Sequence, residues 1–271
     1  MSDVFSRFAP FIQDYIYRCK WEELREIQVL AAKAIFDTDE NLLLSSGTAS
    51  GKTEAAFLPV LTQLWENPSA SVGVLYLSPL KALINDQFER LEGLLEEAAI
   101  PVTKWHGDAS AAAKKRVMKR PQGVIQTTPE SLESMLMHNS SGAYRLFSDL
   151  RFIIIDEMHY FMDNDRGLQL LCLLERLARL IGYHPRRIGL SATLGDCTSA
   201  VQWLNTDSGR DCIVPKCHEK GRSLRLSVRF FPIKEKIPNS DSKVLLQNYY
   251  DYLFESTWNK RCILFSNSKG E

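Results

Sequence analysis

A run of small residues, GTASGKT at 47–53, has the composition of a loop that binds phosphate. It lies between the apolar run Leu42–Leu44 and a helical pattern. Small residues let successive backbone N–H groups point inward at a triphosphate, and a helix N-terminus adds partial positive charge. Lys52 would then reach the β- and γ-phosphates, and the Thr53 hydroxyl would ligate Mg²⁺.

The plainer alternative for this loop is a Gly/Ser turn before an ordinary helix. Ser46 stands where the strict pattern of phosphate loops has glycine, and Gly47 comes one residue later. The flanking strand and helix patterns favour the phosphate loop. The residues expected to contact a nucleotide here are Gly47, Thr48, Ala49, Ser50, Gly51, Lys52 and Thr53.

An acidic pair, Asp156 and Glu157, ends the apolar run Phe152–Ile155. At the carboxyl end of a parallel strand, Asp156 can hold Mg²⁺ beside Thr53, while Glu157 can orient and deprotonate an attacking water. Such a pair alone is often only the start of a loop. Together with the phosphate loop it predicts nucleotide hydrolysis, with catalytic roles for Lys52, Asp156 and Glu157.

Three further side chains are candidates for linking nucleotide chemistry to the rest of the molecule. His159 follows the acidic pair, and Ser191 and Thr193 follow another apolar run, Arg187–Leu190. The two hydroxyls could hydrogen-bond across to Asp156 or His159. On its own, Ser-Ala-Thr is merely a helix cap.

Short apolar runs alternate with helical patterns along most of the chain, which predicts an α/β fold with a mostly parallel sheet and helices on both faces. The expected strands are Leu42–Leu44, Val72–Leu77, Val102–Trp105, Gly123–Thr127, Phe152–Ile155 and Arg187–Leu190. The expected helices are Glu22–Phe36, Glu54–Trp65, Lys81–Ala98, Ser131–His138 and Gly167–Ile181.

The pattern changes after Leu204. We expect a short strand at Cys212–Val214, a strand at Leu224–Phe231, a linker, a helix over about 243–258 and a strand at Cys262–Phe265. The expected domains are 1–235 and 236–271. Because a domain with one helix and one strand has not closed a core, we expect the chain to be part of a longer protein.

Composition excludes several classes of protein. The chain has 271 residues, 45% hydrophobic and 24% charged, and its formal net charge is zero. This excludes a disordered chain or a strong polycation, so any nucleic-acid binding requires a local groove. The N-terminus shows no signal peptide, no apolar stretch is long enough for a membrane span, and six unpaired cysteines are typical of reduced thiols. We therefore expect a cytoplasmic protein, nucleoid-associated if bacterial, without membrane contact.

Two weaker signals favour structural interpretations. The basic run from Lys114 to Arg120 is more typical of a solvated helix face than of a nucleic-acid contact. Cys212, Cys217 and His218 have an imperfect zinc spacing that Cys197 would have to complete, so structural thiols are favoured.

GTASGKT, DEMH at 156–159 and SAT at 191–193 resemble motifs I, II and III of superfamily 2 DEAD/DEAH-box-type helicases. LREIQ at 24–28 resembles a Q-motif, and SPLKAL at 78–83, HGD at 106–108 and TTPESL at 127–132 resemble the motifs between I and II. ILFSNSKGE at 263–271 resembles motif IV, which opens a second domain. The HGD and TPESL forms, with Arg166-Gly167 after DEMH, are closest in style to the large-helicase-related (Lhr-like) branch. In the DEMH motif, Met158 departs from the DEAH, DEVH and related forms that members of this family carry.

The resemblance implies the N-terminal RecA-like P-loop NTPase domain of an ATP-driven helicase. ATP and Mg²⁺ are the implied cofactors, Gln28 would read adenine, and the partners would be a second RecA-like domain and a nucleic acid. Single-stranded DNA is preferred over RNA. The residues carried over for nucleic-acid binding are Pro79, Leu80, Lys81, Gly107, Asp108, Thr128, Pro129 and Glu130.

Three alternatives stay open: a double-strand DNA translocase of the restriction or remodelling type, an RNA helicase, and a nucleotide-sensing module with a dead site. Intact Lys52, Thr53, Asp156 and Glu157 argue against the third. The resemblance also places the arginines that neutralise the γ-phosphate beyond Glu271. We therefore expect residues 1–271 alone to hydrolyse ATP negligibly.

Overall fold

A computed structural model describes residues 3–47, 50–85, 89, 94–95, 98–192, 194–217, 227–231 and 247–264. The chain divides into two compact units, Met1–His218 and Glu219–Glu271. The domain boundary expected after residue 235 lies outside the described residues. The assignment of the C-terminal part to a second RecA-like domain therefore stays a prediction.

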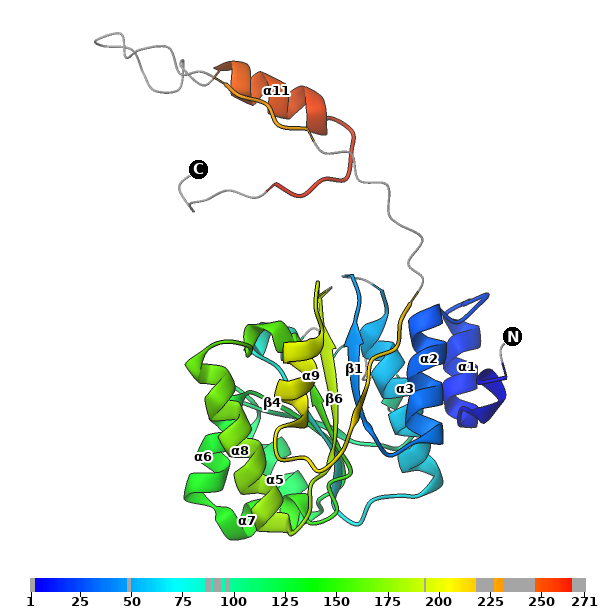
Figure 1. Cartoon of the computed structure of the whole chain (residues 1–271), viewed down its shortest axis with the longest axis vertical. Helices are drawn as coiled ribbons and strands as arrows, with labels where there is room; N and C mark the ends of the chain where they lie inside the picture. The colour runs from blue at the N-terminus through cyan, green and yellow to red at the C-terminus, as the bar shows by residue number, and fades with distance from the viewer. Residues whose placement is uncertain are drawn as a thin grey trace, which may run out of the picture. The chain divides into compact units, whose positions relative to one another are not determined.

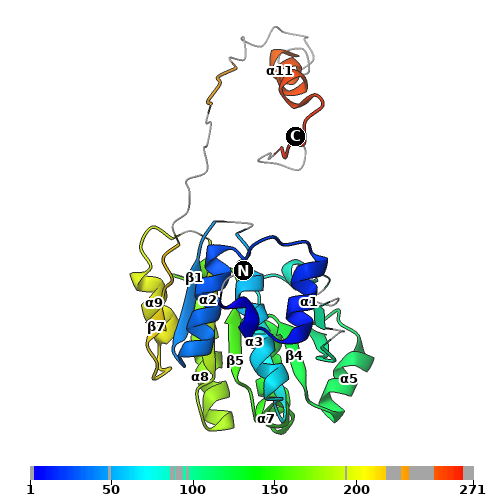
Figure 2. The ribbon, with the colours of Figure 1, turned by 90° about the vertical axis from the view of Figure 1, so that its right-hand side faces the viewer.

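The first unit alternates strands and helices along the chain, as the sequence predicts (Figures 1 and 2). Its strands are β1 Asn41–Ser45, β2 Val72–Leu77, β3 Val102–Trp105, β4 Gly123–Thr127, β5 Phe152–Ile155, β6 Arg186–Ser191 and β7 Cys212–Ile213. Its helices are α1 Pro10–Arg18, α2 Glu26–Asp37, α3 Lys52–Glu66, α5 Ala111–Lys119, α6 Pro129–His138, α7 Ser140–Phe147, α8 Asp165–Ile181 and α9 Thr198–Asn205, with 3₁₀ turns η1 Phe5–Arg7 and η2 Met158–Tyr160. Residues 81–85 are also helical.

The strands form one seven-stranded sheet in the order β3-β4-β2-β5-β6-β1-β7, and each recorded pairing is parallel. Parallel strands are buried on both faces, so their sequences are continuous apolar runs. The predicted bounds of β2 to β5 are confirmed residue for residue. The expected α/β fold with a mostly parallel sheet is confirmed as well.

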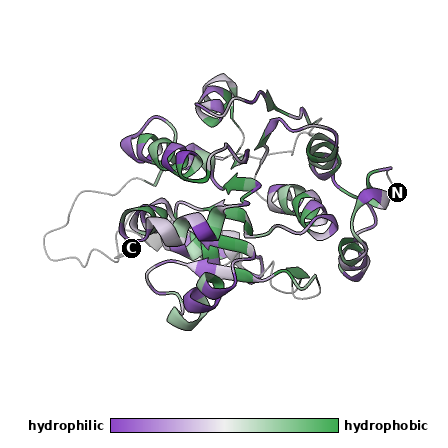
Figure 3. Ribbon diagram, turned by 90° about the horizontal axis from the view of Figure 1, so that it is seen from below, coloured by the Kyte–Doolittle hydropathy of each residue, from purple (hydrophilic) through white to green (hydrophobic). Residues whose placement is uncertain are grey.

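Alternate residues of each strand enter two separate cores, because successive side chains point to opposite faces of a sheet. In β1, Leu42 and Leu44 pack with α1, α2 and α3, whereas Leu43 packs with α6, α7, α8 and α9 on the other face. Figure 3 shows the strands as largely hydrophobic ribbons between these layers of helices. Because helices cover both faces of the sheet, polar side chains that could take part in chemistry are expected at the two edges where the strands begin and end.

Two consecutive arginines of β6 tie helices to opposite faces of the sheet. Arg186 Nη1 donates to the carbonyls of Ile35 at 3.0 Å and Thr38 at 2.7 Å, at the end of α2. Arg187 Nη1 donates to the carbonyls of Leu204 at 3.0 Å and Thr206 at 2.7 Å, at the end of α9. The last carbonyls of a helix have no partner within the helix, so each buried guanidinium satisfies such groups and places positive charge at the negative end of the dipole.

Several sequence predictions need correction. The helix expected over Glu22–Phe36 begins at Glu26, because Gln28 Oε1 accepts a hydrogen bond from the backbone N–H of Arg25 and caps the helix there. Residues 227–231 and 262–264 lie in predicted strands but are not in strands, since no neighbouring strand pairs with them among the described residues. The predicted helix over about 243–258 is observed as α11, Gln247–Thr257.

None of the six cysteines, all of which lie in the described ranges, forms a disulfide bond. Among the residues described, no group of three or more His, Cys, Asp and Glu side chains could hold zinc or another metal ion. His218, one of the residues with zinc-like spacing, lies outside the described ranges. None of the helices in the described ranges is long and apolar enough to cross a membrane.

Candidate active site

The predicted site residues that the structure describes lie along one edge of the sheet, where the parallel strands have their carboxyl ends. Strand register sets Ser45 beside Ser191, Ile155 beside Leu77, and Thr127 beside both Leu77 and Trp105. The segments that follow β1, β6 and β5 carry the nucleotide motifs. The segments that follow β2, β4 and β3 carry the motifs expected to bind nucleic acid. Strand order therefore divides the edge into a nucleotide half and a groove half.

The phosphate loop depends on Gly51, which caps the start of α3 in the left-handed conformation with φ of 86°. A Cβ at this position would lie only 2.9 Å from Nε2 of Gln28, a side chain that is 2% exposed. Glycine is therefore required here both by the backbone angle and by the close approach. The same contact places Gln28 against the end of the loop.

The Lys52 ammonium lies on the loop itself. Its Nζ donates to the carbonyls of Ser46 at 2.7 Å and Gly47 at 2.9 Å. The hydroxyls of Ser46 and Ser50 are 2.6 Å apart, so this hydrogen bond and the two from Lys52 join the beginning of the loop to its end. Thr48 and Ala49 lie outside the described residues. Lys52 is thus placed where a triphosphate wrapped by the loop would meet it.

Asp156 is a buried carboxylate, 7% exposed, and each of its oxygens accepts a hydrogen bond. Oδ1 accepts from the backbone N–H of Glu157 at 2.9 Å, and Oδ2 accepts from the Tyr76 hydroxyl. Burial raises the pKa of Asp156, and the Tyr76 hydrogen bond is the largest opposing influence. Sequence patterning gave no sign of Tyr76, because within β2 it reads as one more apolar core position.

Asp156 and Thr53 are the residues that would hold Mg²⁺. Both offer oxygen ligands, which this ion prefers, and Mg²⁺ bound with a nucleotide needs only one or two protein carboxylates because phosphates and waters complete its shell. A site of this kind is compatible with the lack of a larger acidic cluster among the described residues. The donor set therefore fits the implied ion.

Glu157, His159 and Ser191 form a connected group at the ends of β5 and β6. Glu157 has φ of 45°, and its Oε2 lies 3.3 Å from His159 Nδ1. The Ser191 hydroxyl lies 3.4 Å from the same ring nitrogen, at the outer limit of a hydrogen bond. The predicted pairing of Ser191 with His159 is therefore present in geometry, whereas Thr193 lies outside the described residues.

Met158, the residue at which DEMH differs from the usual motif, fills a defined space. It is fully buried, and a Cβ at Gly189 of β6 would lie 2.8 Å from its sulfur. The flexible thioether thus occupies the room that a glycine leaves on the neighbouring strand. Packing explains this residue without a catalytic role.

A groove of about 560 Å³ lies over the ends of β2, β3 and β4. Its walls contain lysine, hydroxyl and aromatic side chains from three segments that are distant in sequence. The lining residues are Pro79, Leu80, Lys81, Trp105, His106, Gly107, Lys114, Thr128, Glu130, Ser131 and Ser134. Of the residues expected to bind nucleic acid, the groove includes Pro79, Leu80, Lys81, Gly107, Thr128 and Glu130, whereas Asp108 and Pro129 are not among its lining residues.

Ion pairs organise the walls of this groove. Lys81 Nζ lies 2.9 Å from Asp108 Oδ2, and this pairing lowers the pKa of the Asp108 carboxyl. Arg166, at the start of α8, donates from Nε to Glu130 Oε1 at 2.8 Å and from Nη2 to the Pro79 carbonyl at 2.7 Å. Arg166 therefore joins two of the three segments expected to bind nucleic acid, a positioning role for which the Arg-Gly pair was the only sequence signal.

The basic run that was interpreted as a solvated helix face contributes one lysine to the groove. Lys114 of α5 donates from Nζ to the His106 carbonyl at 2.6 Å and lies 5.8 Å from the centre of the Trp105 ring. His106 is 5% exposed, and its ring nitrogens have no hydrogen-bond partner among the described residues. Burial lowers the pKa of this ring, which favours its neutral form. These residues were missed because their roles depend on which strands become neighbours.

Comparison with known proteins agrees with this arrangement. The family model for DEAD/DEAH box helicases matches residues 25–200. The chain belongs to the DEAD/DEAH box helicase family. It is 32% identical to the ATP-dependent helicase Lhr-Core of Methanocaldococcus jannaschii over 272 residues, covering 93% of this chain and 31% of that protein. It is 30% identical to the ATP-dependent DNA helicase Hel308 of Methanococcus vannielii over 261 residues, covering 92% and 32%.

A solved structure supports the same assignment of this family member. Mycobacterium smegmatis helicase Lhr bound to ssDNA and AMP-PNP has a TM-score of 0.75 and 28% identity, covering 94% of this chain and 33% of that one. These matches confirm the RecA-like fold and the resemblance to the Lhr-like branch. The chain spans about a third of the length of the relatives it matches.

Proposed function

We propose that the chain is the ATP-binding part of a nucleic-acid helicase that acts on DNA. The observation that carries this proposal is the placement of the phosphate loop and acidic pair on one sheet edge, directly beside a lysine-bearing groove. Family membership supports an ATP-driven motor. The preference for DNA is supported by similarity to Hel308, described as a DNA helicase, and to an Lhr structure that holds ssDNA.

In this proposal the nucleotide half divides binding and chemistry between different side chains. Gln28 contacts adenine, loop residues 47–53 hold the phosphates, and Lys52 reaches the β- and γ-phosphates. Thr53 and Asp156 hold Mg²⁺, which supplies charge neutralisation for the phosphoryl oxygens. Glu157 takes a proton from the attacking water, and its partly exposed carboxyl, 30% accessible, is better placed for water than the buried Asp156.

His159, Ser191 and Thr193 are proposed to transmit the state of the nucleotide rather than to perform chemistry. The support is the position of His159 and Ser191 at the ends of β5 and β6, between the phosphate loop and the groove half of the sheet edge. The partner for this coupling is the second RecA-like domain, to which we assign residues 236–271 and any chain beyond.

The groove half is proposed to hold the sugar-phosphate backbone of one strand. Thr128 caps α6, and its Oγ1 accepts a hydrogen bond from the Ser131 N–H at 3.4 Å, so the start of a helix faces the groove. Hydroxyls, backbone N–H groups and lysines bind phosphates without reading sequence. Such contacts suit a motor that moves along any sequence.

Lys52→Ala tests the nucleotide half. It removes the ammonium from the loop, and we expect the affinity of the chain for Mg²⁺-ATP analogues to fall by roughly tenfold to 100-fold, the size of lost hydrogen bonds to a charged group. Calorimetric titration with AMP-PNP measures this directly. Lys33→Ala, which removes an exposed lysine from α2, is the matched control. Unchanged affinity in Lys52→Ala would mean that the loop is an ordinary turn.

Lys81→Gln tests the groove half. Each phosphate contact releases about 0.7 of a counterion from a single strand, so the slope of log affinity against log salt concentration is expected to fall by about that amount. Fluorescence anisotropy with single-stranded DNA and RNA of one sequence measures both the slope and the preference for DNA. Lys33→Gln is the control. Equal slopes for wild type and Lys81→Gln would remove Lys81 from the interface, and tighter RNA binding would favour an RNA helicase.

A further inference from the structure

The Tyr76 hydroxyl is a buried polar group in the middle of the sheet. Tyr76 is fully buried in β2, and its ring packs 5.7 Å from that of Phe57 in α3. Burying a hydroxyl costs free energy unless it is hydrogen-bonded, and phenylalanine would fill the same space without that cost. The hydroxyl therefore needs an explanation beyond packing.

Strand register directs this hydroxyl to one acceptor. Tyr76 pairs with Ile154 of β5, so it lies on the face of the sheet that Ile154 and Asp156 share, two residues before the acid. From there its hydroxyl donates to Asp156 Oδ2. The contact joins β2, which leads into the groove segment at Pro79–Lys81, to the carboxylate at the end of β5.

Asp156 depends on this hydrogen bond more than an exposed aspartate would. Among the residues that the structure describes, its other oxygen accepts one hydrogen bond, from the backbone N–H of Glu157 at 2.9 Å, a contact local to the turn. The Tyr76 hydroxyl, by contrast, comes from the neighbouring strand β2 and fixes the direction in which the carboxylate points. Mg²⁺ takes oxygen ligands in a nearly ideal octahedral geometry, so the direction of this carboxylate matters for binding the ion.

We propose that Tyr76 is a positioning residue for the magnesium-binding carboxylate, fixing the orientation of Asp156 through its hydroxyl. This inference rests on the proposed nucleotide site. It makes a distinct claim, because nucleotide binding through the loop and Lys52 does not require Tyr76. Loss of the hydroxyl should weaken the contribution of Mg²⁺ to nucleotide binding and leave metal-free binding unchanged.

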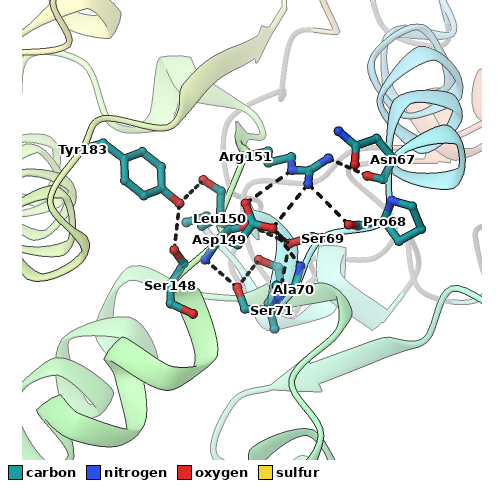
Figure 4. A network of polar contacts seen from close by, with 11 residues as sticks. Asn67, Pro68, Ser69, Ala70, Ser71, Ser148, Asp149, Leu150, Arg151 and Tyr183 are labelled. Atoms are coloured by element: carbon teal, nitrogen blue, oxygen red, sulfur yellow. Dashed lines mark hydrogen bonds and ion pairs between the residues drawn. The ribbon is translucent and has the colours of Figure 1, made fainter.

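Tyr76→Phe tests the proposal, since it removes the hydroxyl and keeps the ring. Tyr183→Phe is the matched control: Tyr183 Oη donates to the Leu150 carbonyl at 3.0 Å at the opposite edge of the sheet (Figure 4). Mg²⁺ is titrated at a fixed concentration of a fluorescent ATP analogue, and affinity is also measured in EDTA. Melting temperature is recorded for all three proteins.

We expect the Mg²⁺ midpoint of Tyr76→Phe to rise about tenfold, the effect of one hydrogen bond to a buried charged group. Affinity in EDTA is expected to equal that of wild type, and the midpoint of Tyr183→Phe is expected not to move. A Mg²⁺ midpoint of Tyr76→Phe within about twofold of the wild-type midpoint would overturn the proposal. A lower melting temperature, or unfolding, of Tyr76→Phe without a tenfold rise of the midpoint would also overturn it, because Tyr76 would then have only a structural role. Wild-type protein that binds no nucleotide would instead remove the proposed site itself.

Discussion

Replacing Glu157 by glutamine is expected to leave Mg²⁺-ATP binding intact and to lower the rate of ATP hydrolysis by roughly 10²–10⁴, the usual contribution of a general base. The amide keeps the size and polarity of the carboxyl but cannot take a proton from water. The geometry separates this role from that of its neighbour, because Asp156 is buried and bonded through both oxygens, whereas Glu157 reaches solvent and contacts His159 at 3.3 Å.

The measurement is steady-state ATPase activity with single-stranded DNA, together with AMP-PNP affinity, on the longest polypeptide that the gene encodes. That form is needed because residues 1–271 alone are expected to hydrolyse ATP negligibly. Glu175→Gln, at a carboxyl on α8 that pairs with Arg179, is the control and should keep the wild-type rate. Parallel loss of binding and hydrolysis in Glu157→Gln would show that Glu157 binds nucleotide and is not the base.

The second large effect concerns stability. Arg186→Met is expected to lower the free energy of unfolding by about 3 kcal/mol or more, because it leaves several buried carbonyls without a donor. Arg186 Nη2 also donates to the Ala34 carbonyl at 3.0 Å and to Thr38 Oγ1 at 3.3 Å, so one guanidinium closes the whole end of α2. Burial lowers its pKa to about 10, which still leaves it charged at neutral pH.

Denaturant unfolding followed by circular dichroism measures this change. Arg179→Met is the matched control, since that side chain is 79% exposed and its one ion pair among the described residues is with Glu175 one turn earlier. Such surface pairs contribute about 0.3–0.5 kcal/mol. If the two variants lost similar stability, the capping of α2 by Arg186 would not be a major contribution to the fold.

The strands and the phosphate loop were predictable because their signals are local. Continuous apolar runs predicted the bounds of β2 to β5 without error. The small residues among the seven at 47–53 predicted a phosphate-binding loop. The contact of Gln28 with adenine was predicted from its motif and stays a prediction. The capping of α2 by Gln28 through the Arg25 N–H was not predicted, and this cap explains why the helix begins later than expected.

Other features depend on contacts between distant segments. Tyr76 looks like a core residue in an apolar strand, and only the register of β2 against β5 brings its hydroxyl to Asp156. Arg166 shows its role only when α8 begins beside Glu130 and Pro79. The short helices α7 and α9 were not predicted, because each has only eight residues in which a helical periodicity can show.

The central claim is that two ligands share one edge of the sheet, the nucleotide at β1, β5 and β6 and the nucleic acid at β2, β3 and β4. Amide NMR spectra of the chain, titrated separately with Mg²⁺-AMP-PNP and a single-stranded oligonucleotide, test it directly. The nucleotide should shift the amides of Gly51–Thr53 and Asp156–His159, and the oligonucleotide those of Leu80–Lys81, His106–Asp108 and Thr128–Ser131. The opposite edge, Ser148–Arg151 and Tyr183 in Figure 4, should not change. Nucleotide-induced shifts confined to that opposite edge, or none at the phosphate loop, would contradict the account.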